Sequence, residues 1–169
     1  MKQHENHQWI RKRLPHRWPF LHVDRVTKIA DKSIEGYKNV SAADSVFMGH
    51  FPEVSVLPGV VVVEALAQLS GLLLIAKEEA AGEAALVDAG EEAIAAAYAD
   101  MGAKIGLLTS IRGFKFIKII EPGDQLFLKS ILKGNNGDAY IFAVSAYVEQ
   151  TEVAVGEIQI YLQNREVVL

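Results

Sequence analysis

Two ionisable side chains lie in surroundings where they could work together as an acid and a base. His50 belongs to the short motif Gly49-His50-Phe51-Pro52, and Glu64 lies inside the otherwise almost wholly apolar run 58–74. Burial of an unpaired carboxylate is costly, so we expect Glu64 to have polar partners or to become neutral. A neutral carboxyl group can donate a proton, and a histidine can accept one near neutral pH. The pair therefore indicates general acid–base catalysis.

The residues around Glu64 predict a helix that begins near Pro58, because proline suits the first helical turn. At 100° per residue, Glu64, Gln68 and Gly71 share one stripe of this helix, whereas the large leucines point elsewhere. Small side chains flank the stripe and leave space beside it. The N–H group of Gly59 lies at the start of the helix, where the dipole favours negative charge developing on a carbonyl oxygen.

Each of these features also has a purely structural interpretation. A histidine beside a proline is often an ordinary loop residue, and Glu64 with Gln68 could be a buried hydrogen-bonded pair that only fixes packing. His16 and His22 are interpreted as structural residues.

Length and composition limit the possible classes of protein. A chain of 169 residues with a net charge of −4 is expected to form one domain with its own core. It has no cysteine, which excludes disulfides and thiolate nucleophiles and is compatible with a reducing cytoplasm. The polar segment 1–13 resembles no signal peptide, so we expect a cytoplasmic protein. Neither a zinc-ligand spacing nor a basic–aromatic stripe is present, and we expect no metal and no nucleic-acid partner.

The segment 54–76 is apolar and about as long as a membrane span requires. Because it contains Pro58, Gly59, Glu64 and Gln68 and is flanked by strand-like segments, we interpret it as a buried helix and expect no membrane span. Segments rich in β-branched and aromatic residues lie before and after it, at 21–29, 34–40, 105–116, 125–133, 139–150 and 153–163.

A helix that is apolar nearly all round must be enclosed. The sequence therefore predicts an α+β domain over residues 1–169, in which an antiparallel β-sheet wraps around one long central α-helix. Residues 1–13 are expected to form a disordered or helical arm. Residues 78–104 are rich in alanine and glutamate and are interpreted either as helix interrupted at Gly82 and Gly90 or as a mobile lobe, inserted between the helix and the next strand. We expect this insertion to tune substrate choice.

Several blocks together resemble the FabZ-type 3-hydroxyacyl-acyl-carrier-protein dehydratases. The blocks occur in the order of that family and cover roughly 14–77 and 105–163. They are Leu14-Pro15-His16-Arg17-Trp18-Pro19-Phe20-Leu21-His22-Val23-Asp24-Arg25-Val26, Lys38-Asn39-Val40, Gly49-His50-Phe51-Pro52, Pro58-Gly59-Val60, Val63-Glu64-Ala65-Leu66-Ala67-Gln68 and Pro122-Gly123-Asp124-Gln125.

The resemblance implies a hotdog fold, a homodimer that can assemble into a hexamer, and no cofactor. It implies removal of water from a (3R)-3-hydroxyacyl thioester on acyl carrier protein to give the trans-2-enoyl thioester. His50 would be the base, and Glu64 of the partner subunit would protonate or orient the departing hydroxyl. Gly59 would hold the thioester oxygen, and Gln68 and Phe51 would border the substrate.

The chain also departs from the family pattern. Glu53-Val54-Ser55 replaces the glycine, basic residue and proline that usually follow His-Phe-Pro, and the basic cluster before Pro122 is thinned. An acidic carrier protein needs a basic docking surface. The candidates for that surface are Lys104, Arg112, Lys115 and Lys118. These departures favour a specialised pathway, such as polyketide or other secondary metabolism, over bulk fatty-acid synthesis.

Two other functions remain open at this point. One is a different enzyme on the same fold, either a thioesterase or a dehydratase that also isomerises the double bond, although the isomerising relatives carry aspartate where this chain has Glu64. The other is a non-catalytic protein that binds acyl chains or carrier protein, against which the presence of both His50 and Glu64 argues.

Overall fold

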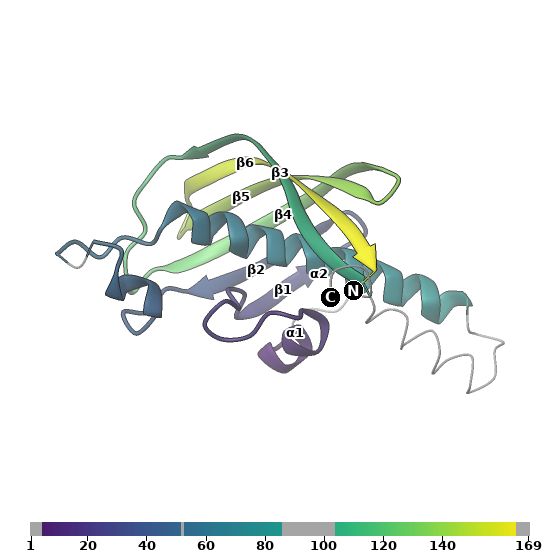
Figure 1. Ribbon diagram of the computed structural model, residues 1–169, viewed down its shortest axis with the longest axis horizontal. Coiled ribbons are helices and arrows are strands. Elements are labelled where there is room, and N and C mark those ends of the chain that lie inside the picture. The colour runs from purple at the N-terminus through teal and green to yellow at the C-terminus, as the bar shows by residue number, and fades with distance from the viewer. Residues whose placement is uncertain (1–4, 52, 86–103, 165–169) are drawn as a thin grey trace.

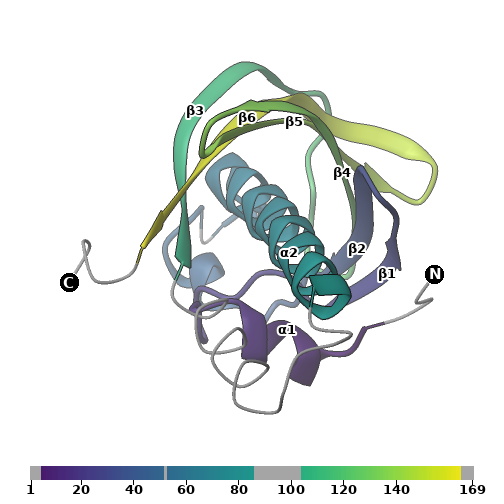
Figure 2. The same cartoon turned by 90° about the vertical axis from the view of Figure 1, so that its right-hand side faces the viewer.

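A six-stranded antiparallel sheet curls around one long helix, α2, in the computed structural model of the protein (Figures 1 and 2). The structure describes residues 5–51, 53–85 and 104–164. The strand order is β1-β2-β4-β5-β6-β3, so the α+β fold expected from the sequence is confirmed. The elements are α1 (His7–Arg13), β1 (Arg25–Ile29), β2 (Ser33–Asn39), a 3₁₀ helix (Ser45–Met48), α2 (Gly59–Ala85), β3 (Lys104–Phe116), β4 (Gln125–Asn136), β5 (Ala139–Val148) and β6 (Thr151–Asn164).

The concave face of the sheet packs against the leucine-rich side of α2. Leu66, Leu69 and Leu73 are fully buried there, as the helical spacing predicts. The hydroxyl groups of Ser70 and Ser130 lie 2.6 Å apart in this core, so both buried polar atoms are paired and α2 is tied to β4. Helix α2 is long and apolar enough to cross a membrane, but 67% of its most apolar window is buried, as expected for the core helix of a folded domain.

Within the N-terminal arm, His7–Arg13 form the helix α1, which covers the side of α2 that the sheet leaves open (Figure 2). Ile10 of α1 is fully buried. Arg13 at the end of α1 pairs with Glu79 near the end of α2, with 2.7 Å between Arg13 Nη2 and Glu79 Oε2. The chain then runs as a loop, residues 14–24, along α2 toward β1. This loop is the element that meets the polar stripe of the helix.

Helix α2 is longer than the sequence interpretation allowed, because it continues through Gly82 to Ala85 without interruption. Residues 78–85 of the expected insertion therefore belong to α2, and Lys104 begins β3. The remainder of the insertion, including Gly90, lies outside the described residues, and its role in substrate choice stays a prediction.

Candidate active site

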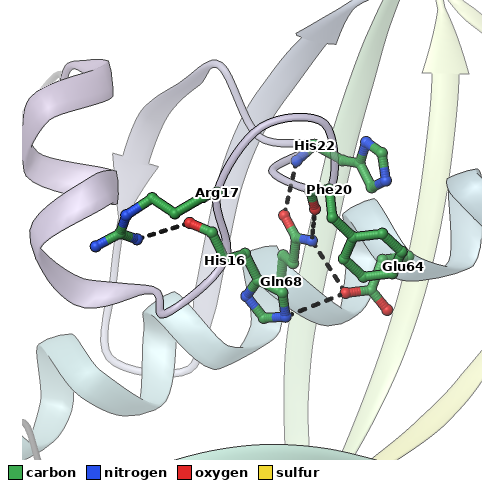
Figure 3. Close-up of polar contacts among 6 residues, drawn as sticks. All are labelled: His16, Arg17, Phe20, His22, Glu64 and Gln68. Atoms are coloured by element: carbon green, nitrogen blue, oxygen red, sulfur yellow. Dashed lines mark hydrogen bonds and ion pairs between the residues drawn. The ribbon is translucent and has the colours of Figure 1, made fainter. Parts of the chain in front are cut away.

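Glu64 is held by Gln68, one turn further along α2. Gln68 Nε2 donates to Glu64 Oε1 at 3.0 Å and to the carbonyl oxygen of Phe20 at 2.7 Å. The side-chain oxygen of Gln68 accepts from the backbone N–H of His22 at 2.8 Å. Gln68 is only 2% exposed. Through these three hydrogen bonds its side-chain amide fastens the loop to the helix and orients the carboxylate of Glu64 (Figure 3).

The structure places a further residue beside Glu64 that sequence reasoning interpreted as structural. His16 Nε2 lies 3.5 Å from Glu64 Oε1, and the imidazole edge points at the carboxylate (Figure 3). Burial lowers the pKa of His16, with a smaller lowering from Arg17, while the negative charge of Glu64 acts in the opposite direction. The contact joins residues 48 positions apart, so no local pattern could reveal it.

His22, the other loop histidine, lines a different depression from Glu64, together with Lys38 and Asp44. Burial, followed by the positive charge of Lys38, lowers the pKa of His22 to about 4, although Asp44 opposes that effect. Lys38 Nζ is itself paired with Asp44 Oδ2 at 2.9 Å. The side chain of His22 is therefore neutral near pH 7.

A cavity of about 210 Å³ runs along the polar stripe of α2. Its polar end is formed by Glu64, Gln68 and His16, and apolar residues of α2, β3 and β6 continue it along the helix past Gly71. A Cβ atom on Gly71 would meet only Leu14 Cδ2, at 3.9 Å, so this position opens the cavity. The predicted stripe of Glu64, Gln68 and Gly71 thus does face free space.

His50 is oriented by a backbone carbonyl of the same loop, that of Val56. His50 Nδ1 lies 2.7 Å from the carbonyl oxygen of Val56. Because a carbonyl oxygen only accepts, Nδ1 carries a hydrogen, and in the neutral ring the lone pair is then on Nε2. Phe51 packs against the imidazole with 4.1 Å between ring centroids. The φ angle of Phe51 is 57°, a conformation that is rare for non-glycine residues and that often marks functional sites.

A second, open depression contains His50 together with Gly59 at the start of α2. A Cβ atom on Gly59 would come 2.7 Å from Phe116 Cζ, so the bare backbone lets the phenyl ring lie close to the helix N-terminus. Glu64 is not among the residues that line this depression, and His50 is not among those that line the cavity at Glu64. Within one described chain the predicted acid and base are therefore in separate hollows.

The predicted docking residues lie on and after the edge strand β3. Arg112, Lys115 and Lys118 are exposed there, and Lys118 borders the depression at His50. Lys104 begins β3, at the opposite end of the strand from Lys115. An extended chain of this length separates the two backbones by up to about 36 Å. Within the described ranges, no three His, Asp or Glu side chains are grouped so that they could hold a metal ion.

The chain is similar to known proteins over most of its length. The model of the FabA-like domain matches residues 14–157. The chain is 40% identical over 161 residues to a 3-hydroxyacyl-[acyl-carrier-protein] dehydratase FabZ of Acinetobacter baumannii, covering 94% of this chain and 97% of that protein. It is 38% identical to the corresponding Listeria monocytogenes protein, covering 92% and 94%.

Among solved structures, a chain of the dehydratase heterocomplex ApeI:P from Xenorhabdus doucetiae superimposes with a TM-score of 0.69 at 19% identity. The match covers 94% of this chain and 93% of that one, and it shows the fold alone.

Proposed function

Because the chain belongs to the FabA-like domain family and, within it, to the FabZ-type hotdog dehydratases, we propose that it dehydrates a (3R)-3-hydroxyacyl thioester on acyl carrier protein in fatty-acid biosynthesis. The observation that carries the proposal is the combination of a histidine with a free Nε2 and a carboxylate held by Gln68, in a chain that resembles such enzymes over nearly its whole length. The specialised pathway suggested by the departures in sequence stays a prediction.

His50 is the base in this reaction. Its Nε2 lone pair removes a proton from the carbon next to the thioester carbonyl, while the Val56 carbonyl steadies the imidazole and supports the positive charge that it gains. The carbonyl oxygen of the thioester becomes an enolate oxygen. The Gly59 N–H, in the first turn of α2 where no intrahelical acceptor exists, donates to that oxygen at the positive end of the helix dipole.

Glu64 acts at the third carbon of the acyl chain, which carries the hydroxyl group. It protonates or orients the hydroxyl on the third carbon, which leaves as water, and the electron pair of the broken C–H bond becomes the double bond. Gln68 holds the carboxylate for this step, and Phe51 packs against His50 at the substrate. The cavity along Ala67 and Gly71 receives the acyl chain.

The two hollows are joined in a homodimer, in which His50 of one chain faces Glu64 of the other. Two features support this arrangement. Strand β3 is an edge strand of 13 residues that pairs with β6 on one side and with no described strand on the other, and such long edges favour pairing with another chain. Large apolar side chains also cluster around the depression at His50 and are exposed there, including Val60, Phe116 and Ile119. Three such dimers can assemble into a hexamer.

The enzyme is cytoplasmic, and its second partner is acyl carrier protein. The acidic carrier docks on the exposed lysine and arginine side chains at the end of β3, next to the hollow of His50, through complementary charge. Arg112, Lys115 and Lys118 form this surface, with Lys104 at a separate position.

A thioesterase and a non-catalytic binding protein remain the alternatives. Incubation with a 3-hydroxyacyl carrier protein, followed by mass spectrometry of the carrier, separates them. The proposal expects a carrier lighter by one water. A free carrier thiol identifies a thioesterase, and an unchanged carrier identifies a binding protein; either outcome overturns the proposal.

A further inference from the structure

Among the described residues, two side chains contact Glu64 through the same oxygen, Oε1. Gln68 Nε2 donates to Oε1 at 3.0 Å, and His16 Nε2 approaches the same atom at 3.5 Å (Figure 3). We propose that His16 is a positioning residue that, together with Gln68, engages Glu64 through Oε1 and leaves Oε2 as the oxygen that meets the departing hydroxyl. This inference rests on the proposed function of Glu64.

The surroundings of His16 select one protonation state. Its Nδ1 is buried without a hydrogen-bond partner among the described residues. If the hydrogen were on Nδ1, it would be a buried donor without an acceptor. In that neutral tautomer Nε2 would carry a lone pair, which would face the carboxylate of Glu64 and repel it. The cationic form is disfavoured because burial lowers the pKa of His16 by more than the negative charge of Glu64 raises it. The neutral ring with hydrogen on Nε2 avoids each of these costs and points a donor at Glu64.

The position of the ring suits this role. His16 stacks on Phe20 with ring centroids 5.9 Å apart, and the carbonyl of Phe20 is fastened to α2 by Gln68. The separation of 3.5 Å exceeds the usual 2.7–3.2 Å of an N–H···O hydrogen bond. Hydrogen bonds of catalytic groups are often long before substrate binds and shorten in the complex, so a small movement of the loop closes the contact.

The cavity beside Glu64 is lined by few other ionisable side chains. Among the described residues that line it, the other ionisable groups are His16 and Glu78. Glu78 lies fourteen positions further along α2, which is about 21 Å of helix. A change in the titration of Glu64 on substitution of His16 can therefore be assigned to the local contact.

The test measures the titration of Glu64 directly, by carbon NMR of protein labelled at the glutamate side-chain carboxyl, with Glu64→Gln identifying the signal. His16→Leu removes the donor from the ionised carboxylate, so the midpoint of Glu64 moves to higher pH. His16→Gln offers an amide N–H in its place and returns the midpoint toward that of the wild type. His22→Gln changes the neighbouring loop histidine, which lines a different depression from Glu64, and leaves the midpoint in place.

Steady-state kinetics supply the second readout. His16→Leu lowers kcat by roughly tenfold or more, the cost typical of a lost hydrogen bond to a charged group, with a smaller change in KM. An unmoved Glu64 midpoint in His16→Leu, or an equal shift in His22→Gln, overturns the positioning role. If His16→Leu does not fold, the His16→Gln protein decides. A Glu64 midpoint equal to that of the wild type supports the proposal, and a midpoint far to higher pH overturns it. Absence of dehydration by the wild-type protein is a separate result and counts against the proposed function instead.

Discussion

His50 and Glu64 belong to different hollows of the same chain. His50 borders an open depression with Gly59 at the first turn of α2, whereas Glu64 lies at the polar end of a cavity along the helix. The proposed reaction needs both side chains at one substrate, and in our proposal a second copy of the chain brings them together. The exposed edge of β3 and the apolar side chains near His50 are suited to hold that copy.

Conservative substitutions should separate the chemistry of His50 and Glu64 from their packing. His50→Asn keeps a donor for the Val56 carbonyl but lacks Nε2, and Glu64→Gln keeps an acceptor for Gln68 but lacks the acid. Each should lower turnover of a 3-hydroxyacyl thioester by roughly 10² to 10⁴-fold, the usual contribution of a general acid or base. Circular dichroism should report an unchanged fold. Near-wild-type turnover of either variant would remove that residue from the mechanism.

The width of the cavity at Gly71 should control the length of the acyl chain. Gly71→Ala fits, since the new Cβ meets only Leu14 at ordinary contact distance, whereas Gly71→Leu fills the space beyond Gln68. The leucine variant should lose roughly tenfold or more in kcat/KM for long chains, because even one methylene in an apolar pocket discriminates 10–200-fold. Turnover of a four-carbon substrate should persist.

The ratio of kcat/KM for twelve-carbon and four-carbon substrates checks this expectation, with Gly71→Ala as the matched control. If Gly71→Leu keeps the wild-type ratio, the acyl chain does not pass this position.

The neutral state of His22 should make the fold less stable in mild acid. The unfolded chain binds a proton on His22 near the ordinary pKa of 6.5, whereas the folded chain binds it only near a pKa of about 4. Between these values the unfolded state holds more protons, so the free energy of unfolding falls as the pH is lowered through this window. His16, whose pKa is also lowered, acts in the same direction.

Urea denaturation at pH 7 and pH 5 measures this effect. His22→Gln should show a smaller loss of stability between the two pH values than the wild type. His7→Gln, which changes an exposed histidine of α1, should retain the wild-type loss. A His22→Gln protein with the full wild-type pH dependence would show that His22 does not contribute.

Local patterns in the sequence were sufficient for the fold and for part of the site. Helical spacing placed Leu66, Leu69 and Leu73 in the core and Glu64, Gln68 and Gly71 toward free space, because one long helix obeys a single period. The contact of His16 with Glu64 depends on the path of a loop across α2 and has no periodic signal. Gly82 was misleading as a helix breaker, because a glycine inside a helix costs only about 1 kcal/mol relative to alanine, which the rest of a long helix can offset.

Mixing two inactive variants tests the shared site most directly. His50→Asn chains supply an intact Glu64, and Glu64→Gln chains supply an intact His50, so a mixed dimer contains one complete site. After subunit exchange between equal amounts, confirmed by pull-down of differently tagged chains, dehydration should recover to about a quarter of the wild-type rate, since half of the dimers are mixed and each holds one working site of two. No recovery in spite of proven exchange would contradict a site built from His50 of one chain and Glu64 of the other.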